Sequence, residues 1–440
     1  MATIPQVADV LQQVLTVVAD RAGRQSGMVR RRDAKLTGSV FTQTLVFGLG
    51  ANPHASLSAL TQTTAALGVT VSAEALHQRF DRTAASCLEQ VLHAAIQQIV
   101  TADPLVMPIL ERFPEVVVHD SSTIVLPEAL REVWLGCGGA PNAGNAALKL
   151  QVALDLRTGR LRGPQLHDGR ESDRNATLDH DLPAGAVRIV DLGYWELAAL
   201  AALTQRGVYW FSRAHATTDI QTSDGRWWSL LTLLQEQGHG PLDLAVRLGA
   251  TAQVPARLLA MPVPEEIAAE RRRRLITEAR DAGEPVSQLR LALASWAIYV
   301  TTIPPELLTL DEALILGRAR WQIELLFKLW KSHGQIDLVR DVNPWRVLCE
   351  LYGRLLSQIV QHWLFLISCW DEPARSLTKA AQTVRAHWLC LATTIGHTAR
   401  LIAAITTLAR CIAAGCRMNP RKKKPNLYQR FLAATASCAG

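Results

Sequence analysis

A change in hydrophobic periodicity after the first hundred residues restricts the fold more than any other feature. Residues 1–105 show helical spacing, whereas "EVVVHD", ending at Asp120, is a β-branched run typical of a buried strand. The alternating segment "ALKLQVALDLRTGRLRGPQL" predicts two antiparallel strands joined at "RTGR". A strand ending at Asp191, a helix closed by Gly207 and the strand "VYWFSRA" follow. Hairpins followed by strand, helix and strand predict an α/β protein whose mixed sheet has helices on both faces.

The same patterns divide the chain, which at 440 residues is too long for one ordinary core, into five segments. The glycine-rich and charged stretch around "EEIAAERRRRLITEARDAGE" interrupts the strand pattern and predicts an insertion whose four arginines are most simply an exposed helical face. The expected segments are a helical N-terminal DNA-binding region at 1–105, a first core part at 106–219, an insertion at 220–290, a second core part at 291–372, and a helical C-terminal region with a basic tail at 373–440.

The N-terminal region contains the spacing of a helix-turn-helix over residues 57–83. A helix, a turn at Gly68, a cap at Ser72 and a second helix fit that motif, and they fit a plain helical hairpin equally well. If these residues form a helix-turn-helix, Arg79 is expected to lie near the DNA. The basic run "RAGRQSGMVRRRDAKL" precedes it and would contact phosphates there, or else is a solvated face.

Composition favours a packed, moderately basic protein. Hydrophobic residues make up 49% of the chain, and the formal charge of +7 favours polyanionic partners. The scattered cysteines form no CxxC pair, so a zinc site is not expected, and their apolar surroundings indicate buried thiols in a reducing cytosol. No signal peptide is evident, and polar residues interrupt the longest apolar stretch, "LLSQIVQHWLFLISCW". A cytoplasmic protein without a membrane span is expected.

The segment "GRARWQIELLFKLWKSHG", residues 317–334, predicts an apolar helix with one charged stripe. On a helical wheel Arg320, Glu324 and Lys331 fall within about 40° of one another, and large apolar residues fill the other sides. Burying unpaired charge costs several kcal/mol, so the stripe is expected to face partners, ions or a polar ligand.

Two acids at predicted strand ends are candidate partners of this stripe. Asp120 or Asp191 alone is most simply a turn or cap residue, but together with Glu324 they predict three converging carboxylates. Carboxylates that repel one another are usually held together by divalent cations. Two such ions about 4 Å apart support phosphoryl transfer.

These residues resemble those of bacterial insertion-sequence transposases of the DDE class, in the insertion-sequence-four group. The helix of that group carries a Tyr-x2-Arg-x3-Glu-x6-Lys signature, which Arg320, Glu324 and Lys331 match in type and spacing, while Gly317 stands at the tyrosine position. "DSST" at Asp120 and "DLGY" at Asp191 look like the two catalytic aspartates. The long interval between Asp191 and Glu324 is also similar to that of the family, in which a β-rich insertion divides the core.

The resemblance implies a ribonuclease-H-like core and cut-and-paste transposition. Asp120, Asp191 and Glu324 would bind two Mg²⁺ ions, with Mn²⁺ as a substitute, to nick DNA at the transposon end, form a hairpin and join the end to target DNA. The implied partners are double-stranded DNA at transposon ends and target, and a second copy in a synaptic dimer, in the bacterial cytoplasm at the nucleoid.

The resemblance also implies DNA contacts. Arg320 and Lys331 would contact phosphates near the cut, and Trp296 would stack on a flipped base or is an ordinary core tryptophan. Arg213 is either a phosphate contact or part of a structural ion pair.

Gly317 leaves three outcomes open. Activity is reduced, the tyrosine's role passes to Tyr299 or Arg318, or the chain is an inactive or repurposed DNA-binding relative. A ribonuclease-H-like nuclease without strand transfer is a further alternative.

Overall fold

The computed structural model describes residues 2–418 except 32, 137–144, 239, 342 and 373, so the expected basic tail beyond 418 lies outside the described residues. The described chain forms two compact units. Unit 1 contains residues up to 106, 121–171 and those from 323 onward, and unit 2 contains 107–120 and 172–322. The chain passes between the units within one strand, β1 (Val116–Leu126), and within one helix, α13 (Trp321–Ser332).

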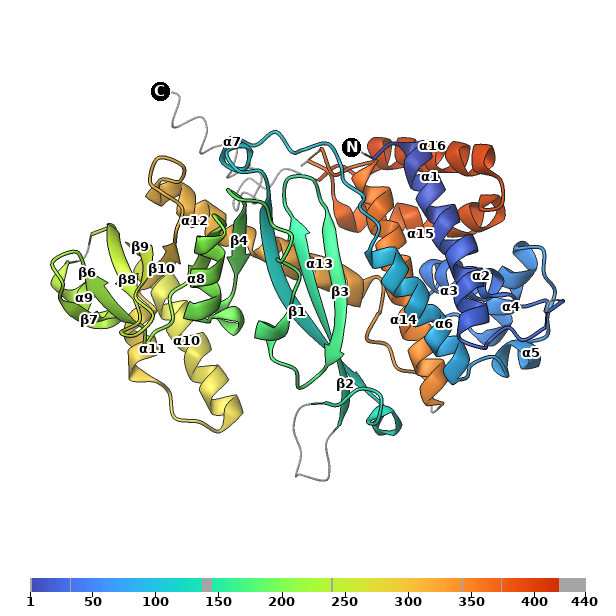
Figure 1. The fold of residues 1–440 in the computed structure, drawn as a ribbon, viewed down its shortest axis with the longest axis horizontal. Coiled ribbons are helices and arrows are strands. Elements are labelled where there is room, and N and C mark those ends of the chain that lie inside the picture. The colour runs from blue at the N-terminus through green and yellow to red at the C-terminus, as the bar shows by residue number, and fades with distance from the viewer. Residues whose placement is uncertain are drawn as a thin grey trace. The chain divides into compact units, whose positions relative to one another are not determined.

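Unit 1 is mostly helical, as expected for both ends of the chain. Its N-terminal helices are α1 (Ile4–Gln12), the π-helix η1 (Gln13–Val18), α2 (Ala19–Gln25), α3 (Gly38–Ala51), α4 (Leu57–Ala66), α5 (Ala73–His77) and α6 (Arg82–Ile96). Its C-terminal helices are α14 (Pro344–Leu366), α15 (Leu377–Thr394) and α16 (Thr398–Gly415). The two sets pack together, with α14 against α3 and α6 and with α15 against α3 (Figure 1).

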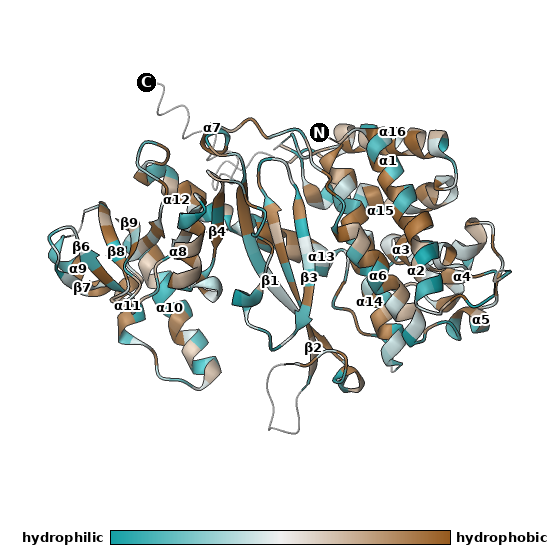
Figure 2. Cartoon of the chain, in the orientation of Figure 1, coloured by the Kyte–Doolittle hydropathy of each residue, from teal (hydrophilic) through white to brown (hydrophobic). Residues whose placement is uncertain are grey.

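The core of this helical bundle is α14. Every residue from Val347 to Leu366 is buried, including most of the apolar stretch singled out in the sequence. Arg354 and Glu350 are buried with it and pair at 2.8 Å. Helices α1 and α15 also contain hydrophobic segments, whereas α2 is largely hydrophilic (Figure 2).

The C-terminal helix α16 is the one helix among the described residues that is long and apolar enough to cross a membrane by length and composition. It packs against α15 and α1. Cys369, in the "LISCW" stretch, is buried as expected, but Cys390 and Cys411 are exposed. The expectation of buried thiols is therefore wrong for these two, which lie on outward faces of α15 and α16.

The expected second helix of the 57–83 motif is two helices. Ser72 caps α5 as predicted, and Gly68 adopts a φ of +84° in the turn before it. The short α5 ends at His77, and α6 begins after Asp81, whose carboxylate caps it. Arg79 therefore lies in the connection between α5 and α6 rather than on a helix face.

The strands form the predicted mixed sheet. In unit 1 the order is β3-β2-β1, where β2 (Ala146–Asp155) and β3 (Leu161–Asp168) pair antiparallel across the predicted turn. In unit 2 the order is β1-β4-β5-β10-β9-β8-β6-β7. The strands of unit 2 are β4 (Val187–Val190), β5 (Tyr209–Arg213), β6 (Asp219–Thr222), β7 (Trp227–Ser229), β8 (Leu242–Leu248), β9 (Val254–Pro262) and β10 (Trp296–Thr301).

Pairing in unit 2 changes from parallel to antiparallel across the sheet. Strands β1, β4 and β5 run parallel, and β10 joins β5 antiparallel. The helices of this unit are α7 (Pro108–Glu111), α8 (Leu197–Gln205), α9 (Leu230–Glu236), α10 (Glu265–Ala282), α11 (Gln288–Leu293) and α12 (Leu310–Ala319). Helices α8 and α12 pack on these strands, so the predicted fold class of a mixed sheet with flanking helices is confirmed.

Three local predictions need correction. The segment "LRLALASWAIYVTTIP", which starts at Leu289, predicts a return to strand, but β10 begins only at Trp296. Ser287 caps a helix before it, and Gln288–Leu293 form α11. The segment 317–334 is two helices, α12 and α13, that meet at Arg320. Its apolar residues are not all buried, since Trp321 is 55% and Leu325 41% exposed.

An ion pair between the buried Glu312 carboxylate and the partly exposed Arg112 guanidinium anchors α12, the helix that leads to Arg320. Glu312, which is 4% exposed, accepts two hydrogen bonds from the Arg112 guanidinium, at 2.6 and 2.8 Å. Burial alone would raise the pKa of the Glu312 carboxyl, but the hydrogen bonds from Arg112 and Thr309 outweigh it, so this pKa lies below its ordinary value. The ionised Glu312 carboxylate therefore stabilises the folded state above its unfolded-state pKa of about 4.3. This contribution to the free energy of unfolding is lost as pH falls through the folded-state pKa.

Glu312→Gln is expected to lower the free energy of unfolding by about 1–2 kcal/mol at pH 7, because the buried side chain loses the charge that strengthens its two hydrogen bonds from the Arg112 guanidinium. The difference from wild type should shrink below about pH 4, where the wild-type carboxylate is also protonated. Urea denaturation at the two pH values measures this, with Glu306→Gln, an exposed glutamate, as the control. An equal difference at both pH values would contradict the prediction.

Candidate active site and DNA-binding residues

The parallel pairing of β1 with β4 brings Asp120 and Asp191 to neighbouring positions. Val116, Val117 and Val118 pair with Val187, Arg188 and Ile189, respectively. Continuing this register by two residues places Asp120 opposite Asp191. Asp191 follows the last residue of β4 as predicted, but Asp120 lies inside β1, because β1 continues to Leu126.

Both aspartates face the same guanidinium group. Arg320 Nη1 lies 3.3 Å from Asp120 Oδ2 and 3.7 Å from Asp191 Oδ2. The two carboxylate oxygens are therefore no farther apart than the sum of these distances. Arg320 reaches them from the junction of α12 and α13, where its own backbone keeps right-handed helical angles, with φ −51° and ψ −33°.

Local contacts hold the two strand segments in place. Asp191 Oδ1 accepts a hydrogen bond from the Leu192 N–H at 2.9 Å, which leaves Oδ2 directed at Arg320. The ring of Tyr194, in "DLGY", stacks on His119 with centroids 4.4 Å apart. His119 immediately precedes Asp120, so this ring pair ties the segment of one aspartate to that of the other. Asp191 is thus a cap residue, as its simplest interpretation predicted, and also a partner of Arg320.

Glu324 and Lys331 lie on α13 within unit 1. Both are half-buried, and Glu324 follows Arg320 by one helical turn along the chain. Lys331 Nζ lies 3.5 Å from the carbonyl oxygen of Thr123, in the part of β1 that belongs to the same unit. The charged stripe predicted on this helix therefore has one member against the β1 backbone.

The donor set suits a hard divalent cation. Within the described residues no group of three or more His, Cys, Asp or Glu side chains is gathered to hold a metal ion, but Asp120 and Asp191 already converge on one cationic group. Carboxylate oxygens are the ligands that Mg²⁺ and Mn²⁺ take, usually with one or two carboxylates and phosphate oxygens completing the shell. The two aspartates therefore fit such a site.

Trp296 and Arg213 lie on paired strands of unit 2. Trp296 begins β10 and is half-buried, while Arg213 ends β5 and is exposed. Arg213 has no ion-pair partner among the described residues, so the structural ion pair considered for it is absent there. It pairs across the strands with Tyr299.

The space beside Gly317 is filled by Tyr299. A Cβ atom at position 317 would lie 2.5 Å from Tyr299 Cζ and 2.7 Å from its hydroxyl oxygen, far inside contact distance. The glycine therefore permits a tyrosine from β10 to lie against α12. Phe211 supports that ring at a centroid distance of 4.9 Å.

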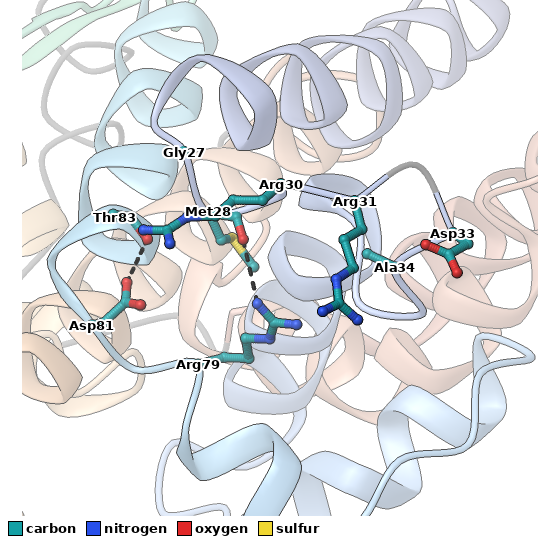
Figure 3. A pocket seen from close by; sticks show the side chains of 9 residues that line it. All are labelled: Gly27, Met28, Arg30, Arg31, Asp33, Ala34, Arg79, Asp81 and Thr83. Carbon is teal, nitrogen blue, oxygen red and sulfur yellow. Dashed lines mark hydrogen bonds between the residues drawn. The ribbon is translucent and has the colours of Figure 1, made fainter.

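The N-terminal basic run forms one wall of a pocket of about 460 Å³ in unit 1 (Figure 3). Arg30 and Arg31 line it from one segment, and Arg79 lines it from another (Figure 3). The Arg79 Nη1 group donates a hydrogen bond to the Met28 carbonyl at 3.3 Å. Asp81, also in the lining, is occupied by capping α6. The pocket thus presents cationic side chains from two parts of the chain.

Arg271 is a further residue near the site that was not predicted from the sequence. This first arginine of the "RRRR" run is half-buried, and its Nη1 donates to the Trp296 carbonyl at 2.8 Å. The signal was its spacing, since it follows the buried Ala268 by three residues and therefore lies on the inner face of α10. The expectation of a wholly exposed arginine face is wrong at this position.

Two aspartates that lie on neighbouring parallel-paired segments and face one arginine are compatible with the class of metal-dependent enzymes that act on phosphodiesters. Residues 111–359 match the family described as "Transposase DDE domain", and the chain belongs to that family. It is therefore a DNA-cleaving and DNA-joining enzyme, a bacterial insertion-sequence DDE transposase. Its domain implies dependence on a divalent metal ion.

Its relatives are also transposases. The chain is 24% identical over 396 residues to the transposase for insertion sequence element IS231F of Bacillus thuringiensis subsp. israelensis, covering 83% of this chain and 81% of the relative. It is 26% identical to that for IS231C of Bacillus thuringiensis subsp. berliner, over 77% and 75% of the two chains. Against that for IS1151 of Clostridium perfringens it is 23% identical, over 67% and 66%.

Proposed function

We propose that this transposase binds the terminal inverted repeats of its element and moves it by a cut-and-paste reaction. The steps are a nick that frees a 3′-hydroxyl at the transposon end, a hairpin intermediate, and joining of the end to target DNA. The observation that carries the proposal is the shared contact of Arg320 Nη1 with Asp120 and Asp191. This contact supports the proposal because it brings two of the proposed carboxylates to one cationic group.

Asp120, Asp191 and Glu324 are proposed as the catalytic carboxylates. Their oxygens would hold two Mg²⁺ ions, or Mn²⁺ in their place, which supply the positive charge that activates an attacking oxygen and stabilises a leaving one. Glu324 is assigned because it follows Arg320 at the spacing of the group's signature. The His119–Tyr194 ring pair keeps the two aspartate segments in register.

Cationic and aromatic side chains would hold the DNA strand. Arg320 and Lys331 are proposed to bind phosphates near the cut, and Arg213 a phosphate beside them, since a guanidinium pairs with phosphate oxygens through two hydrogen bonds. Trp296 is proposed to stack on a base displaced from the helix, which offsets lost base stacking during hairpin formation.

The remaining assignments concern organisation. We propose residues 1–105 as the region that binds the transposon end, 106–219 and 291–372 as the catalytic core, 220–290 as its insertion and 373–440 as a C-terminal region. Two copies would pair in the synaptic complex with both ends, in the bacterial cytoplasm at the nucleoid.

A cleavage assay tests the proposed reaction. The protein is incubated with a duplex carrying the element's terminal repeat and Mg²⁺, and products are resolved on denaturing gels. Nicked, hairpin and joined products are expected. Binding without any cut in Mg²⁺ or Mn²⁺ would instead identify a repurposed DNA-binding relative, and cuts without joined products would identify a nuclease.

The pocket around Arg79 gives a prediction for end binding. Arg30→Gln/Arg31→Gln is expected to weaken binding to duplex DNA by roughly tenfold or more, and to reduce the slope of log affinity against log salt by about 2, because each lost phosphate contact removes about 0.9. Fluorescence anisotropy over a salt series measures both. Arg400→Gln/Arg410→Gln, on the exposed side of α16, is the matched control. An unchanged slope would assign the basic run to a solvated face.

A further inference from the structure

Three arginines from different elements of unit 2 gather around the ring of Tyr299. Arg213 pairs with Tyr299 across β5 and β10, so both side chains lie on the same face of the sheet. Arg271, on α10, reaches the start of β10 through hydrogen bonds to the carbonyls of Ala294 and Trp296.

Arg318 joins this group from α12. It follows Gly317, whose Cα lies against the Tyr299 ring so closely that any side chain there would overlap the ring. The three guanidiniums and the phenol thus come from β5, α10, α12 and β10. These are the strands and helices next to the Asp191–Arg320 contact, because β5 pairs with β4 and Arg320 ends α12.

The cluster has positive charge without a local countercharge. Among the described residues no carboxylate forms an ion pair with Arg213, Arg271 or Arg318. Burial lowers the pKa of Arg271, and repulsion from Arg213 and Arg318 lowers it further, while the Tyr299 phenol has the opposite effect. Like charges held together in this way are destabilising unless an anion binds among them.

We propose that Arg213, Arg271, Arg318 and Tyr299 form a binding site for a backbone phosphate of DNA, separate from the carboxylate pair. Guanidinium groups present planar pairs of N–H donors that match phosphate oxygens, and the phenol adds an O–H donor. The site rests on the proposed transposase function and adds to it a DNA contact from α10, in the expected insertion.

The site also gives Gly317 a function. Because Tyr299 occupies the space beside it, the phenol that a helix tyrosine would carry at this position is supplied from β10 instead. Tyr299→Phe, which keeps the ring and removes only the hydroxyl, is therefore the informative change, whereas Gly317→Ala would displace the ring through its Cβ.

The test is DNA binding without catalysis, in Ca²⁺. Arg213→Gln/Arg318→Gln removes two exposed charges and is expected to weaken binding to a duplex carrying the terminal repeat by about 10- to 100-fold and to lower the salt slope by about 1, as for one lost phosphate. Arg273→Gln, exposed on α10 outside the cluster, should change affinity less than about twofold. Tyr299→Phe should weaken binding by a few-fold, as for one hydrogen bond.

The outcomes separate this site from the proposed function. If the wild type binds DNA but the double variant keeps its affinity and salt slope, with an unchanged melting temperature, the cluster is structural and the inference is wrong. If the wild type binds no DNA in any salt, the proposed function itself fails. A double variant that unfolds is replaced by Arg213→Lys/Arg318→Lys, which keeps the charge but loses the planar donor pair, and an unchanged affinity there also overturns guanidinium-specific binding.

Discussion

Asp191→Asn is expected to reduce strand cleavage at a transposon end by at least about 1,000-fold, or about 4 kcal/mol of transition-state stabilisation, while DNA binding changes little. The amide keeps the hydrogen bond from the Leu192 N–H and the shape of the side chain. It loses the charge that a divalent cation requires. Asp120→Asn and Glu324→Gln should have effects of the same size, because a carboxylate set that binds ions together acts as a unit.

The measurement is the single-turnover rate of nicking on an end duplex, with binding measured separately in Ca²⁺. Asp311→Asn, an exposed acid in the first turn of α12, is the matched control for loss of a carboxylate near the site. Normal nicking by Glu324→Gln would remove this residue from the catalytic set, even if both aspartate variants were inactive. Weak binding by all three variants would instead indicate that the substitutions disturb the fold.

The strand and helix pattern made most of the fold predictable. Hydrophobic alternation located β2 and β3, and the turn at "RTGR" located their hairpin, because these signals are local. The sequence placed Asp120 and Asp191 at predicted strand ends, and the parallel pairing of β1 with β4 is what brings them together. The predicted end of β1 at Asp120 was wrong, because the strand continues to Leu126. The length of a strand depends on the strands that pair with it, and the local sequence pattern does not identify them.

The break between α12 and α13 and the contacts around Gly317 were not predictable in the same way. Helical periodicity runs through residues 317–334, and neither a proline nor a glycine lies next to Arg320. The sequence therefore contains no local signal that separates α12 from α13 at this residue. The glycine was visible as a departure from the signature, but which ring fills its space depends on β10 and on its pairing with β5. Arg271 likewise became informative only when α10 was seen against β10.

Arg320→Gln is expected to change metal binding and cleavage in opposite directions. The Arg320 guanidinium contacts the same two carboxylates that a divalent cation would bind, so it competes with that cation for their oxygens. Removing its charge should strengthen Mn²⁺ binding by about tenfold, equivalent to about 1.4 kcal/mol. Cleavage should nevertheless fall by about 100-fold or more, because the phosphate at the cut loses a charged donor that stabilises the transition state.

Titration of the free protein with Mn²⁺, followed by electron paramagnetic resonance, measures the first effect without any reaction, and single-turnover nicking measures the second. Arg320→Lys should lie between wild type and Arg320→Gln in both, since an ammonium keeps the charge but not the two-pronged geometry. Weaker Mn²⁺ binding by Arg320→Gln would mean that the arginine orients the carboxylates for the ion rather than competing with it. In that case Arg320 would be a positioning residue of the metal site, which acts through its shared contact with Asp120 and Asp191.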